Sequence, residues 1–203
     1  MQRFDTLVLA STNPGKAREI GALLAPLGLR IVTQAELGVV EAEEPHPTFV
    51  ENALAKARHC ARATGLPALA DDSGLCVAAL GGAPGVHSAY WAGREGTREA
   101  RDARNNARLL AELSGRDDRA AHYTCVMVLL AHADDPEPLV AEGRWAGEIA
   151  RSPRGANGFG YDPLFLLPEL GLTAAELAPE EKNRLSHRAQ ALARLVARLR
   201  EGG

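Results

Sequence analysis

The spacing of apolar and polar positions predicts alternating strands and helices in the first part of the chain. An apolar run at 5–11 is typical of a buried strand, and the helical pattern after it starts at Asn13, a residue type that suits an N-cap. A second helical pattern begins with a capping box formed by Thr48 and Glu51. The expected elements, in chain order, are strand 5–11, helix 13–28, strand 29–33 and helix 48–65.

The helix expected at 48–65 has an apolar stripe and a polar side. Asn52 and Lys56 lie four residues apart on the polar side, where they are expected to form an ordinary surface pair. The apolar stripe that should face the core consists of Val50, Ala53, Leu54, Ala57 and Ala61.

The later segments contain consecutive strands. A short strand at 67–72 is expected to end at two adjacent aspartates, and two apolar segments after it are expected to pair as antiparallel strands. Alternating strands and helices followed by consecutive strands indicate an α/β fold with a mixed sheet. The further expected elements are helix 97–115, strands 122–132 and 138–150, loop 152–163 and helix 186–200.

Composition and charge narrow the class of protein. A length of 203 residues is enough for one domain with a sizeable core, and the formal net charge of −3 gives no basic field for duplex nucleic acid. The three cysteines are far apart in the sequence, as expected of reduced thiols rather than a disulfide framework or a zinc site. No signal peptide or membrane-length apolar segment is recognised, so the sequence predicts a cytoplasmic protein.

The segment 10–16 is a candidate phosphate site. It joins a strand to a helix, and a helix N-terminus presents free backbone N–H groups that favour anions. Ser11, Thr12 and Asn13 add short polar side chains, and Lys16 adds a positive charge. The alternative is an ordinary helix cap followed by a surface lysine.

Two acidic segments are candidates for metal binding and water activation. Asp71 and Asp72 are adjacent, and neighbouring strand residues point to opposite faces, so the two carboxylates are expected to have different roles. One could ligate a hard cation such as Mg²⁺ while the other orients or activates water. The acidic segment 41–45 could supply a second carboxylate; the alternatives are a solvated turn and a solvated loop.

Aromatic and basic residues near the end of the chain are candidates for binding a base. Phe159 lies between glycines and could stack on a flat ring, while Asp162 and main-chain groups could contact the edges of that ring. Lys182 and the Ser186–Arg188 segment precede or begin the last helix, an arrangement that suits an anion or a purine edge. Phosphate, metal and base candidates together favour a nucleoside triphosphate as ligand.

Several motifs in register resemble a known family. The segments LASTNPGKAREI, TFVENALAKA, ADDSGLCVAALGGAPGVHSA, GFGYDPLF and LAPEEKNRLSHRAQAL are similar to the inosine/xanthosine triphosphate pyrophosphatases, the Ham1-like noncanonical purine NTP pyrophosphatases. The likeness runs from about residue 7 to the C-terminus. It implies Mg²⁺-dependent hydrolysis of ITP, dITP and XTP to the monophosphate and pyrophosphate. It also implies a homodimer of single domains (1–203), each with two lobes, a long mixed sheet flanked by helices and a cleft between the lobes.

The resemblance assigns roles to residues that match the motifs. Asp72 would be the general base or would orient the attacking water, and it would share Mg²⁺ with Glu43 or Glu44. Lys56 would assist at the phosphates. The residues expected to bind the phosphates are Ser11, Thr12, Asn13, Pro14, Gly15 and Lys16, and Ser73 would also touch the substrate. The residues expected to bind the base are Phe159, Gly160, Tyr161, Asp162, Lys182, His187 and Arg188.

One position departs from the family pattern, and two other functions compete. The family often has arginine where this chain has Tyr90, so either Arg94 supplies that cation or the Tyr90 ring stacks instead. The competing functions are a pyrophosphatase for pyrimidine or modified nucleotides and a nucleotide-binding module without turnover. RNA binding is disfavoured by the net charge and by an aromatic content of 4%.

Overall fold

The computed structural model describes residues 4–201, which divide into two compact units. Unit 1 comprises residues 4–72, 125–143 and 187–201, and unit 2 comprises residues 73–124 and 144–186. Within the described residues the strands form a seven-stranded sheet in the order β2-β1-β3-β4-β5-β6-β7. Three long strands, β3 (Ala68–Val77), β4 (Ala120–Leu130) and β5 (Leu139–Ile149), contribute to both units.

Unit 1 contains the parallel part of the sheet. Strand β1 pairs in parallel with β2 on one side and with β3 on the other. The described elements that lie wholly in this unit are β1 (Thr6–Leu9), α1 (Pro14–Leu24), a 3-10 turn (Ala25–Leu27), β2 (Arg30–Thr33), α2 (Phe49–Thr64) and α5 (His187–Glu201).

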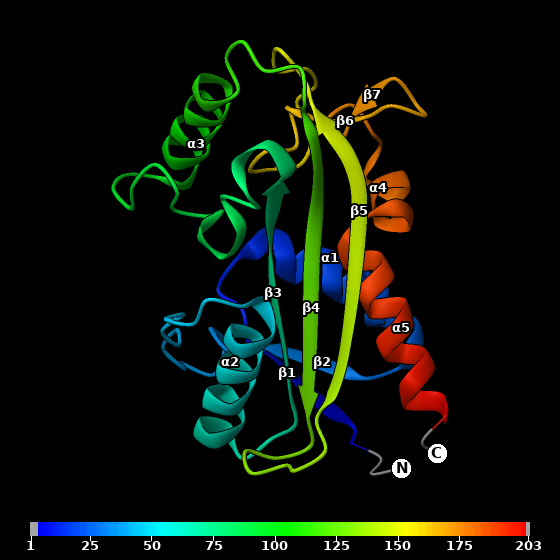
Figure 1. The fold of residues 1–203 in the computed structure, drawn as a ribbon. Coiled ribbons are helices and arrows are strands. Elements are labelled where there is room, and N and C mark those ends of the chain that lie inside the picture. Colours follow the sequence, from blue (N-terminus) through cyan, green and yellow to red (C-terminus); the bar gives the residue numbers. More distant parts are fainter. Residues whose placement is uncertain (1–3, 202–203) are drawn as a thin grey trace. The chain divides into compact units, whose positions relative to one another are not determined.

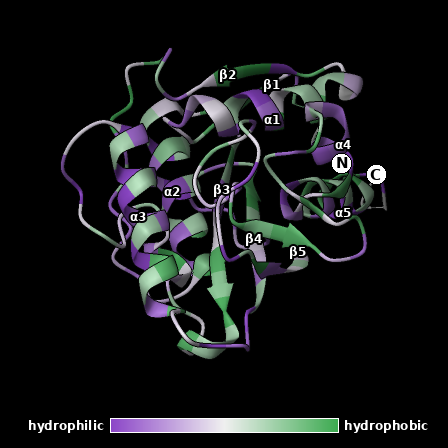
Figure 2. Cartoon of the chain, turned by 90° about the horizontal axis from the view of Figure 1, so that it is seen from above, coloured by the Kyte–Doolittle hydropathy of each residue, from purple (hydrophilic) through white to green (hydrophobic). Residues whose placement is uncertain are grey.

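The two faces of β1 belong to two separate apolar clusters of unit 1. Leu7 and Leu9 pack with side chains of α1 and α5, whereas Val8 and Ala10 pack with side chains of α2. Alternate residues of a strand point to opposite faces, so these helices cover opposite sides of the sheet (Figure 1). In Figure 2 the helices carry both hydrophilic and hydrophobic residues, as expected of helices that cover a sheet on one side only.

Unit 2 contains the antiparallel part of the sheet and its own core. β5 pairs antiparallel with β6, and β6 with β7. Leu109 of the unit's long helix packs with Tyr123, Trp145 and Phe165 in one apolar cluster. The described elements that lie wholly in this unit are short 3-10 turns (Ala78–Leu80 and Gly85–His87), α3 (Arg98–Glu112), β6 (Phe165–Leu167), β7 (Leu172–Thr173) and α4 (Pro179–Leu185).

Most predicted elements are present, and the expected α/β fold with a mixed sheet is confirmed. The capping box is present, since Thr48 is the N-cap of α2 and its side chain accepts a hydrogen bond from the Glu51 N–H. The segment 152–163 is a loop as predicted, and the arrows of β4 and β5 point in opposite directions in Figure 1. The predicted helix 13–28 is shorter, because α1 ends at Leu24 and a 3-10 turn follows.

Two predictions about the extent and the faces of these elements were wrong. The strand predicted to end at the aspartates continues to Val77, so Asp71 and Asp72 lie in the middle of β3. A charged pair is tolerated there because each carboxylate has buried cationic partners, as described below. Val50 was expected to face the core, but it lies in the first turn of α2 and is 41% exposed.

Replacing Gly143 with alanine should destabilise the protein. A Cβ atom at Gly143 would lie 2.0 Å from the His187 carbonyl oxygen and 2.5 Å from the Ala191 nitrogen, both in the backbone of α5. Because backbone atoms cannot turn aside, we expect Gly143→Ala to lower the free energy of unfolding by about 1–3 kcal/mol in urea titrations. Gly21→Ala is the matched control, since no atom lies within 4 Å of its added Cβ. Equal stability of the two variants would contradict the prediction.

Candidate active site

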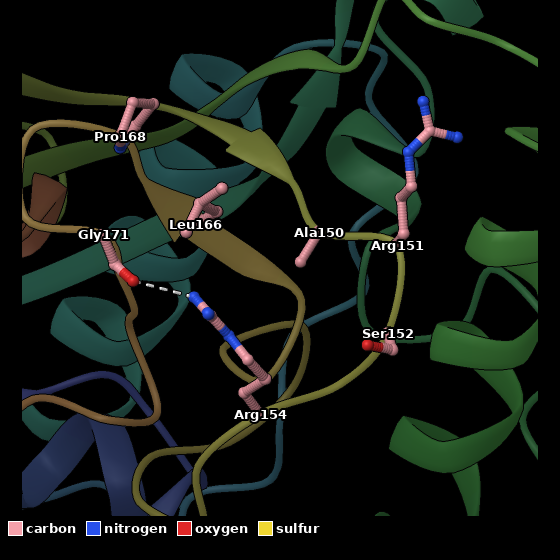
Figure 3. Close-up of a pocket in the computed structure, with 7 residues that line it drawn as sticks. All are labelled: Ala150, Arg151, Ser152, Arg154, Leu166, Pro168 and Gly171. Atoms are coloured by element: carbon pink, nitrogen blue, oxygen red, sulfur yellow. Dashed lines mark hydrogen bonds between the residues drawn. The ribbon is translucent and has the colours of Figure 1, made fainter.

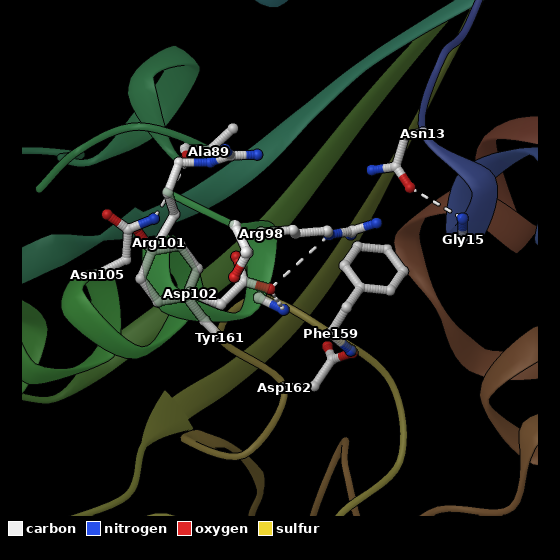
Figure 4. Close-up of polar contacts among 12 residues, drawn as sticks. Asn13, Gly15, Ala89, Arg98, Arg101, Asp102, Asn105, Phe159, Tyr161 and Asp162 are labelled. Carbon is white, nitrogen blue, oxygen red and sulfur yellow. Dashed lines mark hydrogen bonds and ion pairs between the residues drawn. The ribbon is translucent and has the colours of Figure 1, made fainter. Parts of the chain in front are cut away.

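The N-terminus of α1 forms a compact polar turn. The Asn13 side chain accepts hydrogen bonds from the N–H groups of Gly15 (2.9 Å) and Lys16 (3.2 Å), and Ser11 Oγ accepts one from the Asn13 N–H (3.2 Å). Figure 4 shows the bond between Asn13 and Gly15. Pro14 is the first residue of the helix, where its missing N–H costs no helical hydrogen bond. The short polar side chains of the turn thus fix the backbone of 11–16 before any ligand is bound.

Asp71 lies on one face of β3 against two cations. Its carboxylate is 3.0 Å from Lys16 Nζ and 3.5 Å from Arg188 Nε, and its side chain is fully buried. Burial by itself would raise the pKa of Asp71, but Lys16 and Arg188 outweigh that effect and hold its pKa well below the usual range. Arg188 also forms an ion pair with Glu19. Asp71 therefore stays ionised and anchors Lys16.

Asp72 points away from Asp71 and has different partners. Its Oδ1 lies 3.1 Å from Lys56 Nζ, and its Oδ2 accepts a hydrogen bond from the Asn52 amide at 3.4 Å. Lys56 also forms an ion pair with Glu44. Burial and the nearby Glu44 raise the pKa of Asp72, although Lys56 acts in the opposite direction. A carboxylate with a raised pKa is a better proton acceptor, as a general base needs to be.

The Asn52–Lys56 pair was predicted to be an ordinary surface pair, and this prediction was wrong. Asn52 is 1% exposed and Lys56 is 7% exposed. Burial by itself would lower the pKa of Lys56, but Asp72 and Glu44 reverse this effect and raise the pKa above its ordinary value. Asn52 also accepts from the His46 N–H and donates to the His46 carbonyl, so it joins the acidic segment to α2.

The acidic segment 41–45 supplies one carboxylate beside Asp72. Glu44 meets Lys56, the same ammonium that contacts Asp72, whereas Glu41 accepts a hydrogen bond from Thr12 at 2.8 Å. Glu43 lies exposed in the same segment. Among residues 4–201, no group of three or more His, Cys, Asp or Glu side chains is arranged to hold a metal ion. Two carboxylates that already share a cation fit Mg²⁺, which in proteins often has one or two carboxylate ligands and completes its shell with water and phosphate oxygens.

In unit 2, Asp162 is the centre of a second polar cluster. Its carboxylate accepts hydrogen bonds from Lys182 Nζ (2.7 Å), the Phe159 N–H (2.8 Å) and the Tyr123 hydroxyl (3.4 Å). A Cβ at Gly158 would lie 2.1 Å from Asp162 Oδ2, so the loop can close over this carboxylate only with glycine at that position. Three of the predicted base-binding residues are thereby brought together.

The Phe159 ring lies among cations of the same unit. The Arg98 guanidinium carbon is 4.4 Å from the ring centroid, and Lys182 Nζ is 4.7 Å from it. Tyr161 is 3% exposed, and its hydroxyl donates to the Ser88 carbonyl, so its ring belongs to the core of unit 2. Phe159 is therefore the aromatic residue of this loop that is placed to stack on a ligand.

The remaining predicted residues are placed as follows. Ser73 is half-buried in β3, directly after Asp72. His187 is 5% exposed and is the first residue of α5. Arg188 was predicted to contact the base, and the structure places its guanidinium, 2% exposed, against the carboxylates of Asp71 and Glu19 in unit 1.

Comparison with known proteins identifies the family. The model of the Ham1 family matches residues 7–198 of this chain. The protein belongs to the Ham1 family. A dITP/XTP pyrophosphatase of Ralstonia nicotianae is 66% identical over 194 residues, covering 96% of each chain. One from Nitrosomonas europaea is 62% identical over 198 residues, covering 98% of this chain and 96% of the relative.

Solved structures of Ham1 proteins share this fold. A HAM1 protein from Coxiella burnetii superposes with a TM-score of 0.89 at 50% identity, covering 98% of this chain and 100% of that one. A nucleoside-triphosphatase, dITP/XTP pyrophosphatase, from Mycobacterium abscessus superposes with a TM-score of 0.72 at 46% identity, covering 94% of this chain and 98% of that one. The mixed sheet flanked by helices is therefore the Ham1 fold.

The departure from the Ham1 pattern at Tyr90 has a structural counterpart. The Arg94 guanidinium carbon lies 4.4 Å from the Tyr90 ring centroid, and that of Arg101 lies 5.4 Å from it. An aromatic ring and two cations thus lie together in this region, and both alternatives raised by the sequence stay predictions.

Sequence reasoning missed several polar residues of unit 2. Tyr123 contacts Asp162, and Arg98 lies on Phe159, but each is far along the chain from its partner. Tyr123 had a detectable signal, since it alternates with the apolar residues Ala121 and Cys125 along β4 and a buried hydroxyl needs a partner. Arg98 looked like one of many charged residues on a solvated helix.

A pocket elsewhere in unit 2 is unrelated to the predicted site (Figure 3). It is lined by residues of the β5–β6 region, and Arg154 at its wall donates to the Gly171 carbonyl at 3.0 Å and pairs with Glu176. Arg151 pairs with the exposed Asp117. The pocket contains none of the predicted site residues, and acidic or carbonyl oxygens already pair with both of its arginines. The lining residues are Ala150, Arg151, Ser152, Arg154, Leu166, Pro168 and Gly171.

The described helices were compared with the requirements for crossing a membrane. Over residues 4–201, none combines the length and the apolar character that a membrane-spanning segment requires.

Proposed function

We propose that this protein hydrolyses ITP, dITP and XTP to the nucleoside monophosphate and pyrophosphate, and so removes noncanonical purine nucleotides from the nucleotide pool. The observation that carries the proposal is the buried carboxylate of Asp72, which is held by Lys56 and Asn52 and whose pKa is raised. The relatives named dITP/XTP pyrophosphatases support the substrate class, since the chain aligns with them over nearly its whole length.

The residues of unit 1 handle the triphosphate and the water. Water attacks the α-phosphorus, its proton passes to Asp72, and the bond to the bridging oxygen breaks as pyrophosphate leaves. Lys16 and Lys56 neutralise charge on the phosphate oxygens, which is the main means of catalysis in reactions of this kind. The turn at 11–16 contributes its short polar side chains and the positive end of the α1 dipole to the same oxygens. Ser73, the next residue of β3 and the first of unit 2, contacts the substrate beside Asp72.

Mg²⁺ fits the carboxylates of Asp72 and Glu44. When bound, it would withdraw charge from phosphate oxygens and orient the substrate. Of the two glutamates that the sequence left open, Glu44 is favoured over Glu43, because Glu44 and Asp72 contact the same ammonium group.

The residues of unit 2 select the base. Phe159 stacks on the purine ring, and Lys182 donates to the 6-oxo group that hypoxanthine and xanthine carry. Asp162 fixes Lys182 through a 2.7 Å contact, so the ammonium is oriented in advance. Adenine has an amino group at that position, which cannot accept from the buried ammonium, and this mismatch of two donors costs more than a lost contact at the surface. Gly160 and Tyr161 support this part of the site. His187, the first residue of α5 in unit 1, keeps the base-binding role that the resemblance implies.

The remaining features of the proposal follow from the family resemblance. The chain acts as a single domain (1–203) with two lobes, and it forms a homodimer in the cytoplasm without a nucleic-acid or membrane partner. The buried cysteines Cys60 and Cys125 are free thiols, as is usual in a reducing compartment.

A substrate panel tests the proposed function. We expect fast pyrophosphate release from ITP, dITP and XTP in the presence of Mg²⁺, slow release from GTP, ATP and dTTP, and loss of activity when a chelator is added. Ion chromatography or a coupled colorimetric assay would measure the pyrophosphate. Preferred turnover of dTTP would favour the pyrimidine alternative. ITP binding without turnover would favour a binding module.

A further inference from the structure

Three side chains on one face of α3 contact the loop that carries Phe159. Arg98, Asp102 and Asn106 are spaced by four residues and therefore lie in a row along the helix. The Arg98 guanidinium lies over the Phe159 ring at 4.4 Å. Asp102 Oδ2 accepts from the Gly160 N–H, and Asn106 Nδ2 donates to the Gly160 carbonyl, both at 2.9 Å. Figure 4 shows Arg98 and Asp102 beside Phe159.

These contacts fix the main chain on both sides of Gly160. Gly160 has a φ of +64°, a conformation that glycine adopts without strain. Because glycine also adopts many other conformations, the loop needs further contacts to keep this one. Asp102 and Asn106 hold both polar groups of this one residue. Because the Phe159 N–H is bonded to Asp162, the loop has little freedom left around the aromatic ring.

The same helix has a second, purely structural set of contacts for comparison. Asn105 is 2% exposed, donates to the carbonyls of Ser88 and Ala89, and accepts from the Ala92 N–H. These bonds fix the segment 88–92, whose Ser88 carbonyl also accepts from the Tyr161 hydroxyl, but Asn105 makes none of them to the main chain of the 158–162 loop. In contrast, Asp102 and Asn106 are half-buried and contact the loop that presents Phe159. The row on α3 thus acts on the part of unit 2 that binds the base.

We propose that Arg98, Asp102 and Asn106 are positioning residues that orient Phe159 and Asp162 and thereby set the selectivity for 6-oxo purines. The proposal rests on the proposed function, because it takes Phe159, Asp162 and Lys182 as the base-binding group. Both main-chain polar groups of Gly160 are bonded to side chains of α3. The edge of the base is therefore recognised by the side chains of the base-binding residues rather than by the main chain of Gly160.

Asp102→Ala and Asp102→Asn test this proposal as a pair. The alanine variant loses the acceptor for the Gly160 N–H, whereas the amide oxygen of asparagine can still accept that bond. We expect Asp102→Ala to raise KM for ITP and XTP about tenfold, the value expected for losing a hydrogen bond to a charged group, with kcat changed less than about threefold. The ratio of kcat/KM for ITP to that for ATP should fall, and Asp102→Asn should restore most of both values.

Controls separate positioning from general stability. Glu112→Ala removes a carboxylate from the same helix, where it forms only an exposed pair with Arg108, and it should leave KM and selectivity unchanged. Asn106→Leu removes the donor to the Gly160 carbonyl and should reproduce the KM increase, which keeps the test valid if Asp102→Ala fails to fold. Thermal melting of each variant would detect a loss of fold.

Several outcomes would overturn the proposal. One is an unchanged KM in both Asp102→Ala and Asn106→Leu; another is an equal loss for all nucleotides, and a third is Asp102→Asn behaving like Asp102→Ala. If wild-type protein binds ITP without hydrolysing it, only the catalytic part of the proposed function fails, and ITP titration calorimetry of the same variants tests the positioning role. If the wild type neither binds nor hydrolyses ITP or XTP, both proposals fail.

Discussion

Asp72→Asn should lower kcat for ITP hydrolysis by about 10²–10⁴-fold, the range expected when a general base is removed. The amide matches the carboxylate in shape, so the hydrogen bonds from Asn52 and Lys56 retain an oxygen acceptor on one side of the group. An amide cannot take the proton of the attacking water, and it is a poorer ligand for Mg²⁺. We therefore expect the loss of activity to appear mainly in kcat rather than in KM. Initial rates of pyrophosphate release at saturating ITP and Mg²⁺ would measure it.

A matched variant identifies the cause of that loss. Asp134→Asn makes the same chemical change at a side chain that is 87% exposed and pairs only with the exposed Arg62. Its kcat should equal that of the wild type, and both variants should remain folded by circular dichroism. If Asp72→Asn keeps kcat within about threefold of the wild type, Asp72 is not the base, and the proton must pass elsewhere.

The side chains of Asp71 and Asp72 were predicted to point to opposite faces of the strand, and this part of the prediction could be made from the local sequence pattern. The two-residue period of a strand predicts opposite faces, and the structure gives each carboxylate its own cations, Lys16 and Arg188 for one and Lys56 for the other. The same local reasoning ended the strand at the aspartates, because the residues 71–74 have the composition of a turn. Their compensation comes from distant segments, which a local pattern does not contain.

The burial of Lys56 and Asn52 could not be predicted from their own helix. Both have the spacing of a surface pair, but they contact Asp72 in β3, and Glu44 and His46 of the segment before α2 contact them as well. Likewise, Glu19 and Arg188 lie at opposite ends of the sequence yet form an ion pair. The sequence motifs contain both of these pairs, but which residues contact one another is seen only in the tertiary structure.

Short elements without a periodic pattern were also missed. β6 has three residues, β7 has two and α4 has seven, too few for a helical or strand period to stand out. These elements depend on packing in unit 2, where Phe165 of β6 contacts Tyr123 and Trp145. In contrast, the capped helices α2 and α3 are recognisable from sequence because their N-caps and apolar faces are local features.

Asp71→Asn should lower the free energy of unfolding by about 3–5 kcal/mol, the cost of removing one partner from a buried ion pair. Asp71 has no exposed side-chain surface, and it faces Lys16 and the 2%-exposed side chain of Arg188. Burial alone would lower the pKa of Arg188, but Asp71 and Glu19 outweigh burial and raise it. Because a guanidinium is not deprotonated in proteins, it stays charged when Asp71 is lost. Urea unfolding at neutral pH, with Asp134→Asn as an exposed control, would measure the difference.

The pH dependence of that difference tests its electrostatic origin. The pKa of Asp71 is lower in the folded protein than its ordinary value of 3.8, so the ionised carboxylate stabilises the fold above about pH 4. This contribution declines as the pH falls from the unfolded pKa through the folded one. The gap in stability between wild type and Asp71→Asn should therefore be constant from pH 5 to 7 and shrink below about pH 4. A gap that stays constant at acid pH would mean that packing, rather than charge, makes Asp71 necessary, and Lys16 would then need another anchor at the phosphates.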